Sequence, residues 1–127
     1  MKKKQKNIGS ALITLLAFMS AAAIFVTLAV SVIVSNEQAT FKYEQGEETL
    51  TVAEGGAENG IMQLMRNPSY AGETLQIGNG TATITATGSG TRTITSDGVL
   101  NNFHRRIQVV GNYNNAVFSI TSWQEIP

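Results

Sequence analysis

The sequence predicts an α+β protein in which one long N-terminal helix packs on a small antiparallel β-sheet of about five strands. Three observations support this prediction. Residues 10–35 form an apolar run without a charge, glycine or proline, and no proline interrupts the chain before Pro68. After residue 73, threonine alternates with apolar residues in short segments, which is typical of half-buried strands rather than helices.

Length and composition exclude several classes of function. The chain has 127 residues, enough for one modest folded domain, and it has no cysteine, which excludes disulfides, thiolate metal sites and thiol nucleophiles. The formal net charge of zero conceals an uneven distribution. Without residues 1–9 the chain has five basic and nine acidic residues, a net charge of −4, so strong nucleic-acid binding is not expected. The remaining basic residues form a cluster at the N-terminus: Lys2, Lys3, Lys4 and Lys6.

The apolar run at residues 10–35 predicts a transmembrane helix. A helix needs about 20 apolar residues to cross the hydrocarbon of a bilayer, and this run has 26. A buried helix of a soluble core is the first alternative, but apolar runs of that kind are usually shorter. A cleaved secretory signal is the second, but no clear small-residue cleavage site follows the run. The lysine cluster predicts a cytoplasmic N-terminus, with residues 36–127 outside and membrane lipid as the first partner.

The junction KKKQKNIG–SALITLL resembles the class III signal of type IV pilins and type II secretion pseudopilins. The resemblance implies that a prepilin peptidase cuts after Gly9, leaving Ser10 as the first mature residue with a methylated amine. A second segment, residues 51–60 (TVAEGGAENG), is similar to the A-E-A-G-L-E-x-A stretch of PilX-like minor pilins and K-type minor pseudopilins. The two likenesses cover residues 1–66, about half of the chain.

Thr14 departs from the pattern of the major pilins, which carry a glutamate at this fifth mature position. In the family that glutamate neutralises the terminal amine of a neighbouring subunit, whereas a threonine hydroxyl can only form hydrogen bonds, most simply with the carbonyl four residues earlier. The departure favours a minor or initiating subunit. The chain is too short for the extra helical domain of K-type subunits, so the closer likeness is to the PilX-like group.

Residues 36–67 are expected to continue the helix as an amphipathic segment, with residues 1–9 as the leader and 68–127 as the β domain. Small and apolar residues recur at the i, i+4, i+7, i+8 and i+11 spacing, which places them in one stripe along a helix face that can pack against another element. Four glycines weaken this helix by about 1 kcal/mol each relative to alanine, so packing must hold it. The expected helix-packing residues are Thr14 in the apolar run and, on this face, Ala53, Gly56, Ala57, Gly60, Ile61 and Leu64.

Five strands are predicted in the last half of the chain, at residues 74–78, 81–87, 91–96, 103–110 and 116–123. Asn79-Gly80 is expected to form a two-residue hairpin turn, and residues 88–90 a three-residue one. In the second strand, Ala82, Ile84 and Ala86 share one face and threonines cover the other. Ala116, Phe118 and Ile120 are expected to share a face of the last strand. The resemblance implies the ladle-shaped subunit of type IV pilins.

Enzyme chemistry finds little support, and no cofactor is expected. His104 is the single histidine, so a multi-histidine metal site is excluded. Strand alternation places the charged Arg105 on the same face as the apolar Phe103. A bulge, an edge position or a paired carboxylate would explain a charge on that face. Glu54 and Glu58 are typical of a solvated helix face rather than of a catalytic pair, and Trp123 and Ile126 of a core or an edge patch.

The expected function is that of a structural subunit: a minor, PilX-like pilin or a pseudopilin, whose partners are prepilin peptidase, other pilin subunits and the assembly machinery. The alternative is a membrane-anchored extracytoplasmic β domain that binds a partner or ligand without polymerising. A competence pseudopilin that takes up DNA is a third, weaker hypothesis because the exterior is acidic.

Overall fold

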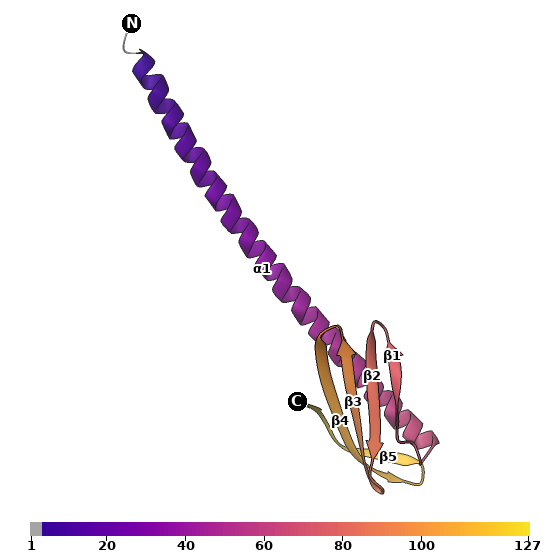
Figure 1. Ribbon diagram of the computed structural model, residues 1–127. Helices are drawn as coiled ribbons and strands as arrows, with labels where there is room; N and C mark the ends of the chain where they lie inside the picture. The colour runs from indigo at the N-terminus through magenta and orange to yellow at the C-terminus, as the bar shows by residue number, and fades with distance from the viewer. Residues whose placement is uncertain (1–3) are drawn as a thin grey trace. The chain divides into compact units, whose positions relative to one another are not determined.

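The computed structural model describes residues 4–127, with side chains from Asn7 onward, and confirms the α+β fold class. Lys2 and Lys3 and the side chains of Lys4 and Lys6 lie outside the described residues. One helix precedes five strands joined as an antiparallel meander in the order β1-β2-β3-β4-β5 (Figure 1). The elements are α1 (Lys4–Arg66), β1 (Gly72–Ile77), β2 (Gly80–Thr87), β3 (Thr91–Leu100), β4 (Phe103–Asn114) and β5 (Val117–Ile126).

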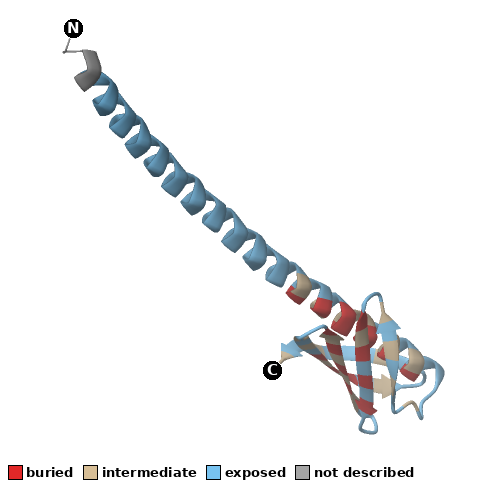
Figure 2. Cartoon of the chain, turned by 45° about the horizontal axis from the view of Figure 1, so that its top comes forward, coloured by how far each residue is buried: buried red, intermediate tan, exposed pale blue. Residues whose placement is uncertain are grey.

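The chain divides into two compact units, residues 1–41 and 42–127. Within the first unit, every described side chain is exposed, as the uniform colour of that part of α1 shows in Figure 2. The second unit contains the hydrophobic core. Its helical part, residues 42–66, contributes Val52, Ala53, Ala57 and Leu64, and the sheet contributes Ile84, Ile94, Ile107 and Val109. A sheet needs an element to cover its apolar face, and α1 supplies that cover.

The first hairpin turn lies one residue earlier than predicted, at Gly78-Asn79 instead of Asn79-Gly80. Ile77 pairs with Gly80, and Gly78 has a φ of +57°, the left-handed conformation that the first residue of a two-residue hairpin turn requires. Gly80 serves a different purpose. A Cβ there would lie 2.7 Å from Val52 Cγ2, so this glycine allows the helix to approach β2 closely. The second predicted turn, residues 88–90, is confirmed.

Two further turns fix the last strands. Asn101 has a φ of +54° in the two-residue connection between β3 and β4. The prediction that Ala116 lies in the last strand was wrong, because Asn115 and Ala116 form a turn with φ values of +51° and +62°. β5 also carries a bulge: Gly111 pairs with Ile120 and Val110 with Ser122, leaving Thr121 as the extra residue.

The helix ends at Arg66, before Asn67-Pro68, and polar contacts then hold the chain against the sheet. The Asn67 amide donates to the Gln63 carbonyl at 2.8 Å. The Arg92 guanidinium on β3 donates to the Tyr70 carbonyl at 2.7 Å and to the Pro68 carbonyl at 3.3 Å. Asparagine before proline disfavours further helix, and Arg92 satisfies the carbonyls that the departing chain exposes.

Candidate functional site

The first part of the site is the apolar stretch of α1 at residues 10–35. Its large side chains are exposed around the whole helix circumference; Ile13 and Phe25 are each 72% exposed and Phe18 is 73% exposed. By length and composition, this helix is apolar enough to cross a membrane. So much uncovered apolar surface is unfavourable in water, by about 25 cal/mol for each Å². This stretch is therefore a candidate membrane anchor.

Five of the six hydroxyl side chains within that stretch are satisfied inside the helix. Thr14 Oγ1 donates to the Ser10 carbonyl at 2.9 Å, as the sequence predicted. The same bond to the carbonyl four residues earlier is made by Ser20, Thr27, Ser31 and Ser35 at 2.8–2.9 Å. A polar group in hydrocarbon must find its partner within the protein. These hydroxyls therefore do not conflict with a position in a bilayer.

Gly9 and Ser10, the predicted processing residues, lie within α1 and are exposed. Among the side chains described from Asn7 onward, none beyond its two chain neighbours lies within 4 Å of the place where a Cβ on Gly9 would stand. The backbone at Gly9 is therefore open to another molecule along the helix side that a side chain would otherwise occupy.

The second part of the site is the contact between α1 and the sheet, which small residues bring close. A Cβ on Gly56 would clash with Ser96 Oγ and lie 2.7 Å from Ala82 Cβ. A Cβ on Gly60 would lie 2.9 Å from Ile84 Cγ2 and 3.0 Å from Ile94 Cγ2. Two of the predicted helix-packing residues are not buried: Thr14 is exposed in the apolar stretch, and Ile61 is half-buried at the edge of the contact. The others are buried: Ala53, Gly56, Ala57, Gly60 and Leu64.

Glu73 joins the helix to β1 through a network that the sequence did not predict. Its Oε1 accepts hydrogen bonds from Asn59 Nδ2 at 2.7 Å and from the Tyr70 hydroxyl at 3.1 Å. Burial, together with the hydrogen bond to Glu73 and the negative charge of Glu73, raises the pKa of Tyr70 to about 12. The bond between the helix and β1 joins Asn59 to Glu73, 14 residues apart, so local spacing gave no signal for it.

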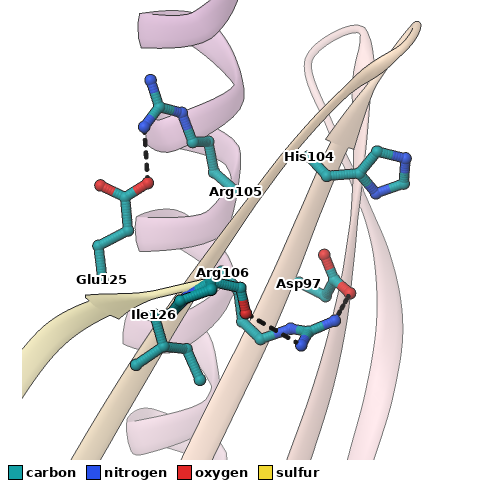
Figure 3. Close-up of a pocket in the computed structure, with 7 residues that line it drawn as sticks. Asp97, His104, Arg105, Arg106, Glu125 and Ile126 are labelled. Carbon is teal, nitrogen blue, oxygen red and sulfur yellow. Dashed lines mark hydrogen bonds and ion pairs between the residues drawn. The ribbon is translucent and has the colours of Figure 1, made fainter.

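The charged residues of β4 are paired with carboxylates (Figure 3). Arg105 Nη1 lies 2.7 Å from Glu125 Oε1, which explains its place beside apolar residues, and Arg106 Nη2 lies 2.8 Å from Asp97 Oδ2. The hydrogen bond and the charge of Glu125 raise the pKa of Arg105 above its ordinary value. These pairs and the exposed His104 border a cavity of about 230 Å³.

The opposite charges beside that cavity are balanced in pairs. Both arginines are neutralised by carboxylates, and the pairs are partly exposed to solvent. Between residues 4 and 127, no three histidine or carboxylate side chains converge as metal ligands. Glu54 is half-buried and Glu58 exposed on α1.

No protein-family model, curated protein or solved structure matches this chain.

Proposed function

We propose that this chain is a minor, PilX-like type IV pilin or a pseudopilin, a structural subunit processed after Gly9 and assembled into a cell-envelope filament. The observation that carries the proposal is the fully uncovered apolar stretch at residues 10–35, directly after an exposed glycine and a basic leader. Ordinary signal removal would discard such a stretch. Cleavage at Gly9 would instead keep it for membrane anchoring and for packing between subunits.

The uniform exposure of this stretch suits the exchange of environment that filament assembly requires. Lipid surrounds the helix before assembly, and similarly apolar helices surround it afterwards. Moving apolar surface between two apolar surroundings changes its free energy little, because neither side exposes it to water. In the pilin family an assembly ATPase drives this extraction.

Charge supports the proposed orientation. Four lysines precede the apolar stretch, whereas the helix after it is acidic, with Lys42 as its one basic residue before Arg66. An excess of basic residues marks the cytoplasmic side of a membrane helix, so residues 36–127 would be extracytoplasmic. The acidic residues of that segment are Glu37, Glu44, Glu47, Glu48, Glu54 and Glu58.

Thr14 supports a minor or initiating role. Threonine carries no negative charge that could neutralise the terminal amine of another subunit, and its hydroxyl already donates to the Ser10 carbonyl. A buried amine without an opposing charge is costly, which would disfavour a second copy docking in the manner of a major pilin. A subunit without the glutamate charge is suited to the filament tip, where no further subunit docks onto it.

The test is the N-terminal mass of the protein from cells with active prepilin peptidase, compared with the Gly9→Val variant. The proposal predicts a wild-type chain that begins at Ser10, with a methylated amine, and a Gly9→Val chain that keeps its leader. Ala11→Val, at an exposed helix position beside the cleaved bond, is the matched control and keeps normal processing. Cofractionation of the processed chain with sheared filaments then tests assembly.

The alternative is a membrane-anchored β domain that binds a partner and never polymerises. The observation in its favour is that residues 42–127 have their own hydrophobic core. An intact leader in the presence of active peptidase, together with absence from sheared filaments, would favour this function. DNA uptake is a weaker hypothesis because Arg105 and Arg106 are both paired with carboxylates. Salt-dependent binding of duplex DNA would revive it.

A further inference from the structure

The helix-facing side of β5 carries apolar side chains that the chain leaves uncovered. Residues directly opposite in an antiparallel pair lie on the same face. Trp123 pairs with the buried Val109, Ile120 with the buried Gly111, and Phe118 with Tyr113. Ile120 is nonetheless 51% exposed and Trp123 is 39% exposed, and Phe118 is half-buried. We call these three residues, Phe118, Ile120 and Trp123, the β5 face.

The width of the sheet explains why α1 does not cover the β5 face. Neighbouring strands lie about 4.8 Å apart, so five strands extend across about 19 Å, whereas helices pack about 10 Å apart. The close approaches of α1 are to the other four strands. Gly55 lies against Ile77 on β1, and Gly56 lies against Ala82 on β2 and Ser96 on β3. At the start of this helical segment, Gly46 lies against the Arg105 side chain on β4. None of these approaches is to β5, where Ile120 and Trp123 remain exposed beside α1.

The side of α1 that faces β4 and β5 is apolar close to the sheet and acidic farther from it. Val52 and Asn59 point toward β1 and β2, through their contacts with Gly80 and Glu73. Helical geometry therefore turns the opposite flank toward β4 and β5. The half-buried Leu50 and Ile61 lie at its base, and three glutamates at i, i+7 and i+11 lie further out: Glu47, Glu54 and Glu58.

The charges beside the β5 face are predominantly negative. Arg105 is the basic residue at this end, and it is engaged by Glu125 at 2.7 Å, with Glu47 also near it. A partner that covers the β5 face would therefore gain from basic residues along one edge and lose from acidic ones. An aliphatic stripe flanked by lysine or arginine has the required chemistry.

We propose that the β5 face docks an amphipathic helix of a partner protein, with its aliphatic stripe on Phe118, Ile120 and Trp123 and its basic edge along Glu47, Glu54 and Glu58. The helix would lie beside α1 as the second helix of the layer. A second copy of this chain does not fit, because the exposed side of its own helix at residues 42–66 is acidic. The proposal holds whether or not the chain enters a filament.

Trp123 provides the measurement, because it is the single tryptophan of the chain and lies within the β5 face. The full chain is placed in nanodiscs of phosphatidylcholine and titrated with a synthetic leucine–lysine amphipathic helix of about four turns. A leucine–glutamate peptide of the same pattern is the control. A peptide that binds only to lipid leaves the emission of Trp123 unchanged. The emission therefore distinguishes binding to the β5 face from binding to the bilayer.

The expected result is a saturable blue shift of Trp123 emission with the lysine peptide, weakened by salt, and none with the glutamate peptide. Ile120→Ser weakens this binding by about tenfold, the loss of one apolar contact of roughly 1.4 kcal/mol. Val117→Ser, at a 60% exposed position on the opposite face of the same strand, leaves it unchanged. Glu54→Gln combined with Glu58→Gln weakens binding and reduces its salt dependence.

Three results would overturn the proposal. The first is the absence of a shift with either peptide. The second is an equal shift with both peptides, which would mean that the glutamates of α1 do not select a basic partner. An equal loss of binding in the Ile120→Ser and Val117→Ser variants would likewise mean that the β5 face is not the binding surface. The third is a shift that grows with protein concentration alone, which would mean that a second copy covers the face.

Discussion

Gly56 on α1 lies directly against Ser96 on β3, and no side chain fits between them. Ser96 is completely buried, and its Oγ has no hydrogen-bond partner. The absence of a Cβ at position 56 therefore sets the distance between the helix and the centre of the sheet. The glycine costs helix propensity and gains close packing, which explains why so glycine-rich a segment remains helical.

Gly56→Ala is expected to destabilise the domain by about 1–3 kcal/mol, because the new Cβ overpacks the contact by more than the helix gains in propensity. Gly55→Ala is the matched control. Its Cβ would meet Ile77 Cδ1 at 3.4 Å, an ordinary contact, so it leaves stability unchanged or raises it. Urea unfolding of both variants measures the difference. Equal stabilisation by the two alanines would show that α1 does not approach the sheet so closely.

Tyr70 is expected to make the domain less stable in strong alkali. Burial and Glu73 raise its pKa to about 12, above its ordinary value of 10.0. Between these values the folded protein binds more protons than the unfolded chain, so its stability is complete below pH 10 and falls as pH rises toward 12. Tyr70→Phe removes this part of the decline, whereas Tyr43→Phe, at an exposed position, does not. Identical alkaline unfolding profiles for the two variants would refute the role of Tyr70.

Arg92 is expected to contribute more to the stability of the domain than the ion pair between Arg105 and Glu125 does. Its guanidinium donates to the Pro68 and Tyr70 carbonyls, a geometry that lysine does not reproduce, so Arg92→Lys costs about 1–3 kcal/mol. Glu125→Gln breaks a pair whose side chains are about 40% exposed and costs at most about 1 kcal/mol, less at high salt. Thermal unfolding ranks the two variants, and the reverse order would contradict this assignment.

A charge within the apolar stretch is expected to prevent its insertion. Aspartate near the centre of a membrane helix costs about 2.5–3.5 kcal/mol, so Ala22→Asp reduces the membrane-bound fraction of the protein. Gln38→Asp, on the same helix beyond the apolar stretch, is the control and leaves that fraction unchanged. Carbonate extraction of membranes measures both. Full retention of Ala22→Asp in the membrane would argue against residues 10–35 as the spanning segment.

The elements were predictable from the sequence because each has a strong local pattern. Alternation in 81–87 specifies which side of β2 is buried, and Asn67-Pro68 specifies the helix end. The position of the first turn was not predictable, because Gly78-Asn79-Gly80 offers two turns. Gly80 packs against Val52, which is distant in sequence, and therefore lies in β2. The turn accordingly falls one residue earlier, at Gly78-Asn79.

The β5 face shows a second limit of local pattern. Simple alternation places Ile120 and Trp123 on opposite faces of the strand, because one position is even and the other odd. The bulge at Thr121 shifts the alternation and brings both to the helix-facing side. The sequence left open whether Trp123 lies in the core or in an edge patch, and its neighbours could not be foreseen without the pairing of β4 with β5.

The central claim is that the apolar helix stays attached to the β domain throughout maturation. The intact mass of the membrane-extracted mature protein tests this claim most directly. The account predicts one species that begins at Ser10 and ends with the β domain, still requiring detergent for extraction. A water-soluble species that begins after residue 35 would contradict it.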